Sequence, residues 1–260
     1  MPVFKAEGVI LRRQTIGEAD RVLTLLTREH GKLRAAARGS RRVTSRLGGR
    51  LEPYTRARFL LARGRTLDVI AQVEVVDAFA GIRADLMRSA YAAYVAELAD
   101  RFLPERDRHE DVFALVCATL GALDLAGEDE AELVTLRFAL HLASALGYRP
   151  RAGECVGCGR PLPRGGGPGE RWAFSPALGG ALCPGCAGRN QEAVRTAPGV
   201  LAMVAHLLRA PSGQPIRLRI PREQRADLAR LVQAHLEYRL EGRLRAPAVI
   251  ERLRALPPPA

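Results

Sequence analysis

Four of the five cysteines in this chain stand in two Cys-x-x-Cys pairs, Cys155/Cys158 and Cys183/Cys186, which are separated by 24 residues. Both pairs enclose a glycine, and glycine lets the backbone turn tightly so that its N–H groups can point at thiolates. Zinc ribbons usually place about 15–20 residues between such pairs, and a glycine-rich insert at residues 165–169 explains the excess. The spacing therefore predicts one structural Zn²⁺ held by these four thiolates.

Two redox dithiols or two disulfides are the alternatives to a metal, and the rest of the chain favours neither. The surrounding sequence does not resemble a thioredoxin-like context, and residues 1–7 lack the basic stretch and apolar core of a signal peptide. The longest apolar run, residues 112–126, is broken by Asp124 and is too short to span a bilayer. We expect a cytoplasmic protein with no membrane partner, where free thiolates are available to a metal.

Common catalytic motifs are absent from the sequence, which has no Gly-x-Ser-x-Gly, P-loop, His-Glu-x-x-His or dinucleotide fingerprint. The fifth cysteine, Cys117, lies in the most apolar segment, where packing is a better interpretation than nucleophilic chemistry. A metal with four thiolate ligands also has no open position for water. We predict that the chain is not an enzyme, and only a metal bound by three sulfurs and a water would restore that alternative.

Positive charge is concentrated at the two ends of the chain. The formal charge is +12, of which residues 1–80 contribute +8 and residues 191–260 contribute +6, whereas residues 81–150 contribute −5. Arginine far outnumbers lysine, which indicates a compositional bias, but such a bias does not create an excess of cations over anions. Charge that is segregated in this way indicates a polyanion-binding surface on a neutral to acidic scaffold.

The densest basic segment has a single acid, Glu29, between residues 21 and 51. Residues 32, 34 and 38 are separated by even numbers of positions, so their side chains project from the same face of a regular strand. The loop that follows adds more arginines. Such a strip can track a phosphate backbone and release its counterions, although a merely solvated strand face is the alternative. The predicted DNA-binding residues are Lys32, Arg34, Arg38, Arg41, Arg42, Arg46 and Arg50.

Aromatic residues, which stack on bases in strong single-strand binders, are scarce in the first 80 residues. Their scarcity predicts weak sequence preference, marked salt dependence and tolerance of both single- and double-stranded DNA. A second basic group, Arg239, Arg243 and Arg245, either extends the strip or coats the end of a helix. The sequence does not decide between these two roles.

The first 80 residues have the pattern of a small β-barrel. Short apolar segments bounded by turn residues predict strands at 6–12, 21–27, 32–38, 54–62 and 66–76. The OB-fold is the commonest five-stranded barrel, and an SH3-like barrel fits the lengths nearly as well. Residues 1–80 are therefore predicted to form an OB-fold DNA-binding domain.

After residue 81 the apolar spacing becomes helical. One helix ends at Pro104, residues 112–125 are apolar almost all round and should be central, and Asp129 with Glu132 suggests a capping box for the next helix. Helices are also expected from 199 to 209 and from 221 onward. The fold class is α+β multidomain, with the helical domain split into residues 81–150 and 191–260 by a four-cysteine zinc module at 151–190.

The chain resembles the RecO recombination mediators in motifs that occur in order along essentially its whole length. These motifs are Gly-Val-Ile-Leu-Arg at 8–12, Gly-Glu-Ala-Asp at 17–20, Thr-Arg-Glu-His-Gly-Lys-Leu at 27–33, Ala-Arg-Gly at 37–39, Leu-Glu-Pro-Tyr at 51–54, Leu-Arg-Phe at 136–138, Leu-Gly-Tyr at 146–148, Phe-Ser at 174–175 and Gly-Gly at 179–180.

The resemblance implies an OB domain, a helical domain and a zinc module, and all four cysteines are present here. It further implies a nucleoid-associated protein that binds single- and double-stranded DNA and anneals complementary strands. Together with RecR, such a protein helps to load RecA onto DNA that is coated by single-strand-binding protein, whose acidic C-terminal tail docks on the helical domain. That docking should pair an apolar groove with an arginine, and we expect it within residues 191–245.

An RNA- or ribosome-associated protein with an OB-fold and a zinc knuckle is the main alternative, because positive charge and zinc knuckles suit it equally well. Acceleration of DNA strand annealing separates the two classes.

Overall fold

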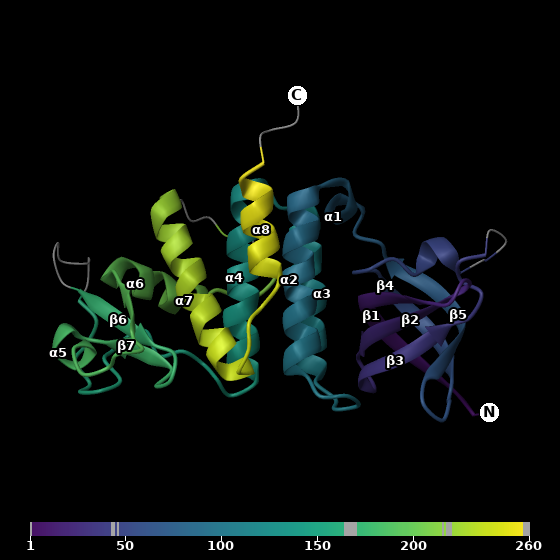
Figure 1. The fold of residues 1–260 in the computed structure, drawn as a ribbon, viewed down its shortest axis with the longest axis horizontal. Coiled ribbons are helices and arrows are strands. Elements are labelled where there is room, and N and C mark those ends of the chain that lie inside the picture. The colour runs from purple at the N-terminus through teal and green to yellow at the C-terminus, as the bar shows by residue number, and fades with distance from the viewer. Residues whose placement is uncertain are drawn as a thin grey trace.

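The chain folds into three parts that lie in a row, with a β-barrel at one end, a layer of helices in the middle and a small sheet at the other end (Figure 1). The computed structural model describes residues 2–42, 45, 47–163, 171–214, 216 and 220–256. Among these residues, no helix combines the length and the apolar character that crossing a bilayer requires.

Five strands close the N-terminal barrel in the order β1-β2-β3-β5-β4. All neighbouring pairs are antiparallel except β3 and β5, which pair in parallel through Ala35 and Asp68. This is the topology of an OB-fold, so the predicted five-stranded barrel is confirmed and the SH3-like alternative is wrong. The strands are β1 (Val3–Ile16), β2 (Asp20–Thr27), β3 (Gly31–Ala37), β4 (Arg56–Ala62) and β5 (Asp68–Asp77).

The interior of the barrel is built from alternate residues on each strand, as the two-residue period of a β-strand requires. The buried side chains of β2 and β3 that point inward are Leu23, Leu25 and Leu33, and Phe59 and Leu61 of β4 meet them. The residues between them point outward, and they form the surface from which both the domain contact and the candidate interface are built.

The helical part begins with α1 (Ala80–Ala84) and α2 (Leu86–Phe102), which ends two residues before Pro104 as predicted. The Asp85 carboxylate caps α2 by accepting a hydrogen bond of 2.8 Å from the Arg88 backbone. Apolar residues of β1 and β2, including Val9 and Leu26, belong to the same buried cluster as this helix. The remaining helices of this part are α3 (Glu110–Leu125), α4 (Glu128–Ala145), α6 (Pro198–Leu207), α7 (Arg222–Leu240) and α8 (Ala246–Arg254).

Two details of the helical prediction are wrong. Helix α4 begins at Glu128 with Gly127 as its N-cap, and no side chain caps it. The supposed capping-box residues have other partners, because Asp129 pairs with Arg225 at 2.5 Å and Glu132 with Arg254 at 2.7 Å. Both carboxylates therefore bind arginines from distant parts of the chain, and neither of them caps the helix.

Helix α3 is also less central than its composition predicts. One face, with Val112 and Val116, is fully buried, but Leu125 is 84% exposed and Ala114 is exposed too. The sequence of α3 is therefore apolar on both faces, although only one face is buried.

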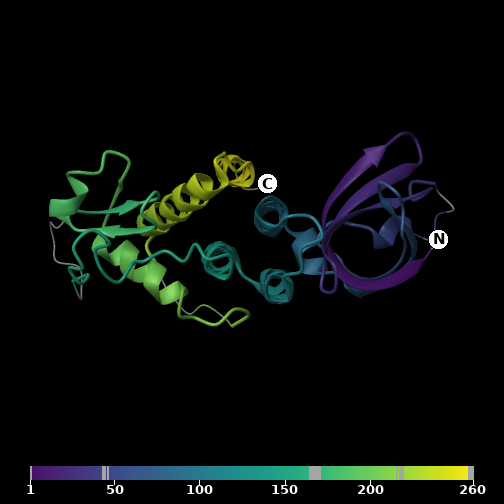
Figure 2. The ribbon, with the colours of Figure 1, turned by 90° about the horizontal axis from the view of Figure 1, so that it is seen from below.

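The module at the far end is a three-stranded sheet with a short helix. Its strands are β6 (Trp172–Ser175), β7 (Gly180–Leu182) and β8 (Val194–Thr196), in the order β7-β6-β8, and α5 (Pro184–Ala187) follows β7. The side chains of Trp172 and Phe174 are fully buried and belong to the cluster that also forms the core of the helical part. Figure 2 shows this module opposite the barrel, with the helices between them.

Candidate metal centre and nucleic-acid interface

The four cysteines meet at one point between the first Cys-x-x-Cys turn and the start of α5. Their Sγ atoms lie within 4.8 Å of one another, and 3.7 Å separates the Sγ atoms of Cys158 and Cys183. A tetrahedral Zn²⁺ with Zn–S bonds of about 2.3 Å requires sulfur atoms about 3.8 Å apart. The donor set and its spacing therefore fit zinc.

Hydrogen-bonded turns hold both cysteine pairs in place. The Cys155 carbonyl accepts a 2.8 Å hydrogen bond from Gly159, whose φ of +75° is the left-handed conformation that favours glycine. The Cys183 carbonyl accepts one of 3.0 Å from Cys186. A Cβ atom at Gly157 would lie only 3.1 Å from the Cys186 sulfur. The glycine inside the first pair thus lets the second pair approach closely, since a larger residue would need the Cys186 side chain to shift.

The thiols influence one another strongly because they are so close. Burial would raise the pKa of Cys155, but hydrogen bonds from the backbone of Cys183, Gly157 and Cys158 overcome that effect and lower its pKa to about 6. Hydrogen bonding with Cys183 and the other two thiols raises the pKa of Cys186 to about 12. Four thiolates cannot form here without a cation to neutralise them, which a divalent metal supplies.

The fifth cysteine, Cys117, lies on α3 away from the other four. Burial is the largest influence on this thiol and raises its pKa to about 11. A thiol that is protonated at neutral pH is a poor nucleophile, so the packing interpretation stands.

The predicted basic strip runs from the end of β3 into the loop that follows it. Arg41 donates hydrogen bonds to the carbonyls of Gly17 and Glu18, at 3.3 and 2.9 Å, and so attaches the loop to the β1–β2 turn. Arg46 lies outside the described residues. Four side chains are exposed and form no ion pair with any other residue in the described ranges, namely Arg34, Arg38, Arg42 and Arg50.

Lys32 occupies the predicted face of β3 but has a different environment. Its amine lies 3.1 Å from the Asp100 carboxylate of α2, and its side chain is only 12% exposed. The α2–α3 loop covers the same strand end, because the Arg106 backbone donates a 2.7 Å hydrogen bond to the Lys32 carbonyl. Lys32 therefore joins the barrel to the helices, and it is not part of the exposed strip.

A further arginine, Arg12, extends the outer face of the barrel. Thr24 of β2 pairs with Arg12 of β1 on one side and with Arg34 of β3 on the other, so these residues form one cross-strand row. Residues that lie opposite one another across a sheet share a face. The sequence offered no signal for Arg12, because it reaches this face through an irregularity in β1 between Ile10 and Arg12.

The second predicted basic group is divided between two places. Arg243 and Arg245 line a groove of about 690 Å³ between the barrel, α2 and the start of α8. Arg239 lies elsewhere: it donates to the carbonyl of Pro176 at 3.2 Å and stacks over Tyr148, which holds the cysteine module against α7.

The opposite side of the barrel has its charges paired. Arg56 bonds the Glu7 carboxylate at 2.7 Å through Nε and lies 3.2 Å from Asp77, and Arg58 lies 3.8 Å from Glu74. Exposed arginines without an ion pair among the described residues occur on the β1–β2–β3 side, which is the side that OB-folds use for oligonucleotides, and also at Arg63 and Arg65 of the β4–β5 loop.

The barrel topology defines an OB-fold protein, with exposed arginines on and after strand β3. Family models agree with that class: the one described as Recombination protein O N terminal matches residues 1–79, and the one described as Recombination protein O C terminal matches residues 83–248. The chain belongs to the Recombination protein O family.

Curated relatives match over nearly the full length. The DNA repair protein RecO of Symbiobacterium thermophilum is 37% identical over 257 residues, which cover 98% of this chain and 99% of that protein. The protein of the same name from Pelotomaculum thermopropionicum is also 37% identical, covering 99% and 97% of the two chains. That of Bifidobacterium adolescentis is 41% identical over 197 residues, covering 75% and 78%.

Proposed function

We propose that this chain is a cytoplasmic, nucleoid-associated DNA-repair protein that binds single- and double-stranded DNA and anneals complementary strands. The observation that carries the proposal is the set of four exposed arginines without ion pairs described above, of which Arg34 lies on strand β3, in the face that OB-folds use for nucleic acids, and the other three lie in the segment that follows β3. Family membership and the names of the relatives support the same function. No covalent step is part of it.

Annealing on such a surface is electrostatic. Two DNA strands repel each other through their phosphates, and arginines that contact the backbone reduce this repulsion while the bases remain free to pair. Residues 1–80 contain only four aromatic residues, Phe4, Tyr54, Phe59 and Phe79. Stacking of bases on aromatic rings should therefore contribute little sequence preference. Arg34, Arg38, Arg42 and Arg50 provide the contacts, and Arg41 orders the loop that carries them.

A bound Zn²⁺ would have a structural role. It would neutralise the four thiolates and cross-link two turns that are far apart in the sequence, with no open position for a reacting water. The buried side chains of Trp172 and Phe174 connect this module to the helical core, so loss of the metal would weaken packing next to α7.

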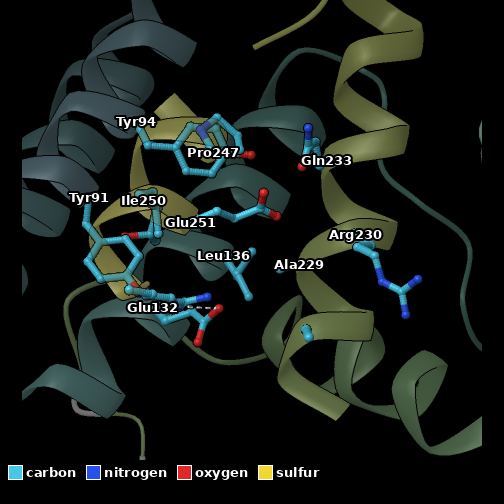
Figure 3. A pocket seen from close by; sticks show the side chains of 13 residues that line it. Tyr91, Tyr94, Glu132, Leu136, Ala229, Arg230, Gln233, Pro247, Ile250 and Glu251 are labelled. Carbon is cyan, nitrogen blue, oxygen red and sulfur yellow. Dashed lines mark hydrogen bonds and ion pairs between the residues drawn. The ribbon is translucent and has the colours of Figure 1, made fainter. Parts of the chain in front are cut away.

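The helical part supplies the surface for protein partners, which the resemblance identifies as RecR and single-strand-binding protein, with RecA served indirectly. A cavity of about 130 Å³ lies between α2, α4, α7 and α8, with Leu136, Ala229 and Ile250 in its wall (Figure 3). An apolar cavity of about 150 Å³ can hold a benzene ring. We place the apolar end of the acidic tail of single-strand-binding protein here, and its carboxylates next to Arg230, whose present partner is the partly exposed Asp227 on the same helix.

Charge reversal at Arg230 tests this placement. Arg230→Glu should abolish binding of a peptide with the sequence of the partner's acidic tail and leave DNA affinity unchanged. Equal peptide affinity of the variant and the unaltered protein would place the tail elsewhere.

Strand annealing on coated DNA tests the function as a whole. The protein should accelerate annealing of two complementary oligonucleotides, both free and covered by single-strand-binding protein. No acceleration, together with tight binding of a structured RNA, would favour the RNA-associated alternative.

A further inference from the structure

A groove separates the barrel from the helices, and it continues the basic face around β1. Its floor is one side of α2, with Ala93 and Ala96, and its walls are β1 and the segment that leads into α8. The volume of about 690 Å³ is within the range of ligand pockets, about 300–1,000 Å³. Because it is walled on two sides, the groove suits one extended strand better than a duplex.

Four arginines from three different parts of the chain line this groove: Arg12 of β1, Arg101 of α2, and Arg243 and Arg245 before α8. Arg101 donates a hydrogen bond to the Arg243 carbonyl. The Arg12 and Arg245 side chains form no ion pair or hydrogen bond with another residue in the part of the chain that the structure describes. Cations that face one another across a groove repel unless an anion lies between them.

The two carboxylates in the groove, Glu97 and Asp100, compensate the four arginines only in part. Glu97 accepts hydrogen bonds from the backbone N–H groups of Arg245, at 2.9 Å, and Ala246, at 2.8 Å, and so caps the start of α8. Asp100 is occupied by Lys32 at 3.1 Å. The arginines therefore leave a positive potential that the groove walls concentrate.

Local backbone irregularities build the wall that carries Arg12. A regular strand would place Leu11 opposite Thr24, but the register shift between Ile10 and Arg12 puts Arg12 there instead. Such a bulge brings two consecutive side chains to one side, and here Leu11 packs against the helices while Arg12 lines the groove.

Tyr54 lies beside the bulge in an unusual conformation. Its φ is +69°, a left-handed value that is rare for an aromatic residue, and its backbone donates a 2.7 Å hydrogen bond to the Ile10 carbonyl. The Tyr54 side chain also lines the groove. Its hydrogen bond to Ile10 thus holds this aromatic side chain at the groove, next to the bulge that carries Arg12.

We propose that this groove is a second section of the DNA-binding surface and holds the phosphate backbone of a single strand. The strand leaves the arginines of β3, crosses the row formed by Arg34, Thr24 and Arg12, and enters between Arg12 and Arg245. This inference rests on the proposed function, and it adds a path that extends beyond the barrel.

Neutral substitutions measure the contribution of the groove. Arg12→Gln combined with Arg245→Gln should weaken binding of an oligothymidylate of about 30 nucleotides and make the slope of log K against log salt shallower by about 1.4, or about 0.7 for each lost phosphate contact. Arg189→Gln with Arg195→Gln, at exposed positions of the cysteine module, is the matched control and should leave the slope unchanged. An unchanged slope for the groove variant overturns the proposal, and an acidic protein segment would then be the better occupant.

Photocrosslinking locates the strand directly. A benzoylphenylalanine in place of Val249, which lines the groove and is 48% exposed, should crosslink to the oligothymidylate, whereas one in place of the exposed Leu178 of the cysteine module should not. Crosslinking at neither position overturns the groove path. The proposed DNA-binding function is tested independently of the groove by Arg34→Gln combined with Arg38→Gln, which changes only the barrel face. Loss of binding in that variant, with no effect in the groove variant, rejects only the groove.

Discussion

Lys32 of β3 and Asp100 of α2 form an ion pair across the junction between the barrel and the helices, with 3.1 Å between Nζ and Oδ1. The same junction requires glycine at position 31, where a Cβ atom would lie 2.0 Å from the Asp107 carbonyl oxygen. One end of β3 is therefore fixed to the helical part, and the other end carries the exposed arginines. On this one strand, Lys32 therefore contacts the helical part, whereas Arg34 stays exposed for the proposed contact with DNA.

Substitution of Lys32 should affect stability more than DNA binding. Lys32→Met removes the ion pair and leaves Asp100 partly buried without its partner, which we expect to cost about 1 kcal/mol of unfolding free energy. Urea denaturation measures that loss, and DNA affinity should stay within about twofold, since one lost phosphate contact costs more than this at low salt. Arg34→Met is the matched control on the same strand. A larger loss of DNA affinity for Lys32→Met than for Arg34→Met would return Lys32 to the DNA surface.

The exposed arginines should each contribute one phosphate contact. The combined substitution of Arg38, Arg42 and Arg50 by Gln should weaken binding of any duplex sequence and make its salt slope shallower by about 0.9 per residue. Fluorescence anisotropy at several salt concentrations measures this slope. Arg58→Gln, on the ion-paired face, is the control with the same chemical change. If the triple variant keeps the slope of the unaltered protein, the strip is only solvated.

Removal of the metal ligands should destabilise the helical part and spare the barrel. Cys155→Ser with Cys158→Ser should abolish zinc binding, lower the melting temperature and shift the fluorescence of Trp172, the single tryptophan, to longer wavelength as its buried environment loosens. DNA affinity should fall less than in the triple arginine variant. Unchanged melting temperature and fluorescence would argue against a structural metal at this site.

Stability should also decline in mild acid because of His235. Burial is the largest influence and lowers the pKa of this imidazole, while Nε2–H donates a 2.8 Å hydrogen bond to the Tyr148 carbonyl. The unfolded chain takes up a proton as the pH falls through about 6.5, whereas the native state resists protonation. The contribution is therefore complete above that pH and is lost as the pH falls toward the lower native pKa.

His235→Gln keeps a donor for the Tyr148 carbonyl but cannot titrate. Thermal unfolding between about pH 7.5 and pH 5.5 should show a steeper loss of melting temperature for the unaltered protein than for the variant. Parallel curves would mean that His235 is protonated as readily in the native state as in the unfolded chain.

The sequence predicted the features that depend on local pattern. Strand alternation in residues 1–80 determines the barrel, and the two Cys-x-x-Cys pairs determine which sulfur atoms meet, because both signals lie within short segments. The family resemblance correctly identified the OB-fold, which strand lengths alone did not separate from an SH3-like barrel.

Features that depend on contacts distant in the sequence were not predictable. The capping box at Asp129 and Glu132 was wrong, because α4 begins at Glu128 and the two carboxylates pair with Arg225 and Arg254, about a hundred residues away in the chain. The ion pair of Lys32 with Asp100 was missed because no local signal reveals Asp100, and a role of Lys32 in DNA binding stays a prediction. Arg12 was missed because a register shift in β1, rather than parity, turns it outward.

Equilibrium binding at low ionic strength tests the central claim most directly. The intact protein is titrated with single- and double-stranded oligonucleotides of two unrelated sequences, and then with increasing salt. We predict that both forms are bound, that the two sequences of each form are bound with similar affinity, and that all are released as salt rises, because arginine–phosphate contacts carry the interaction. Failure to retain any of them at the lowest salt would contradict the account, whatever the metal content of the protein.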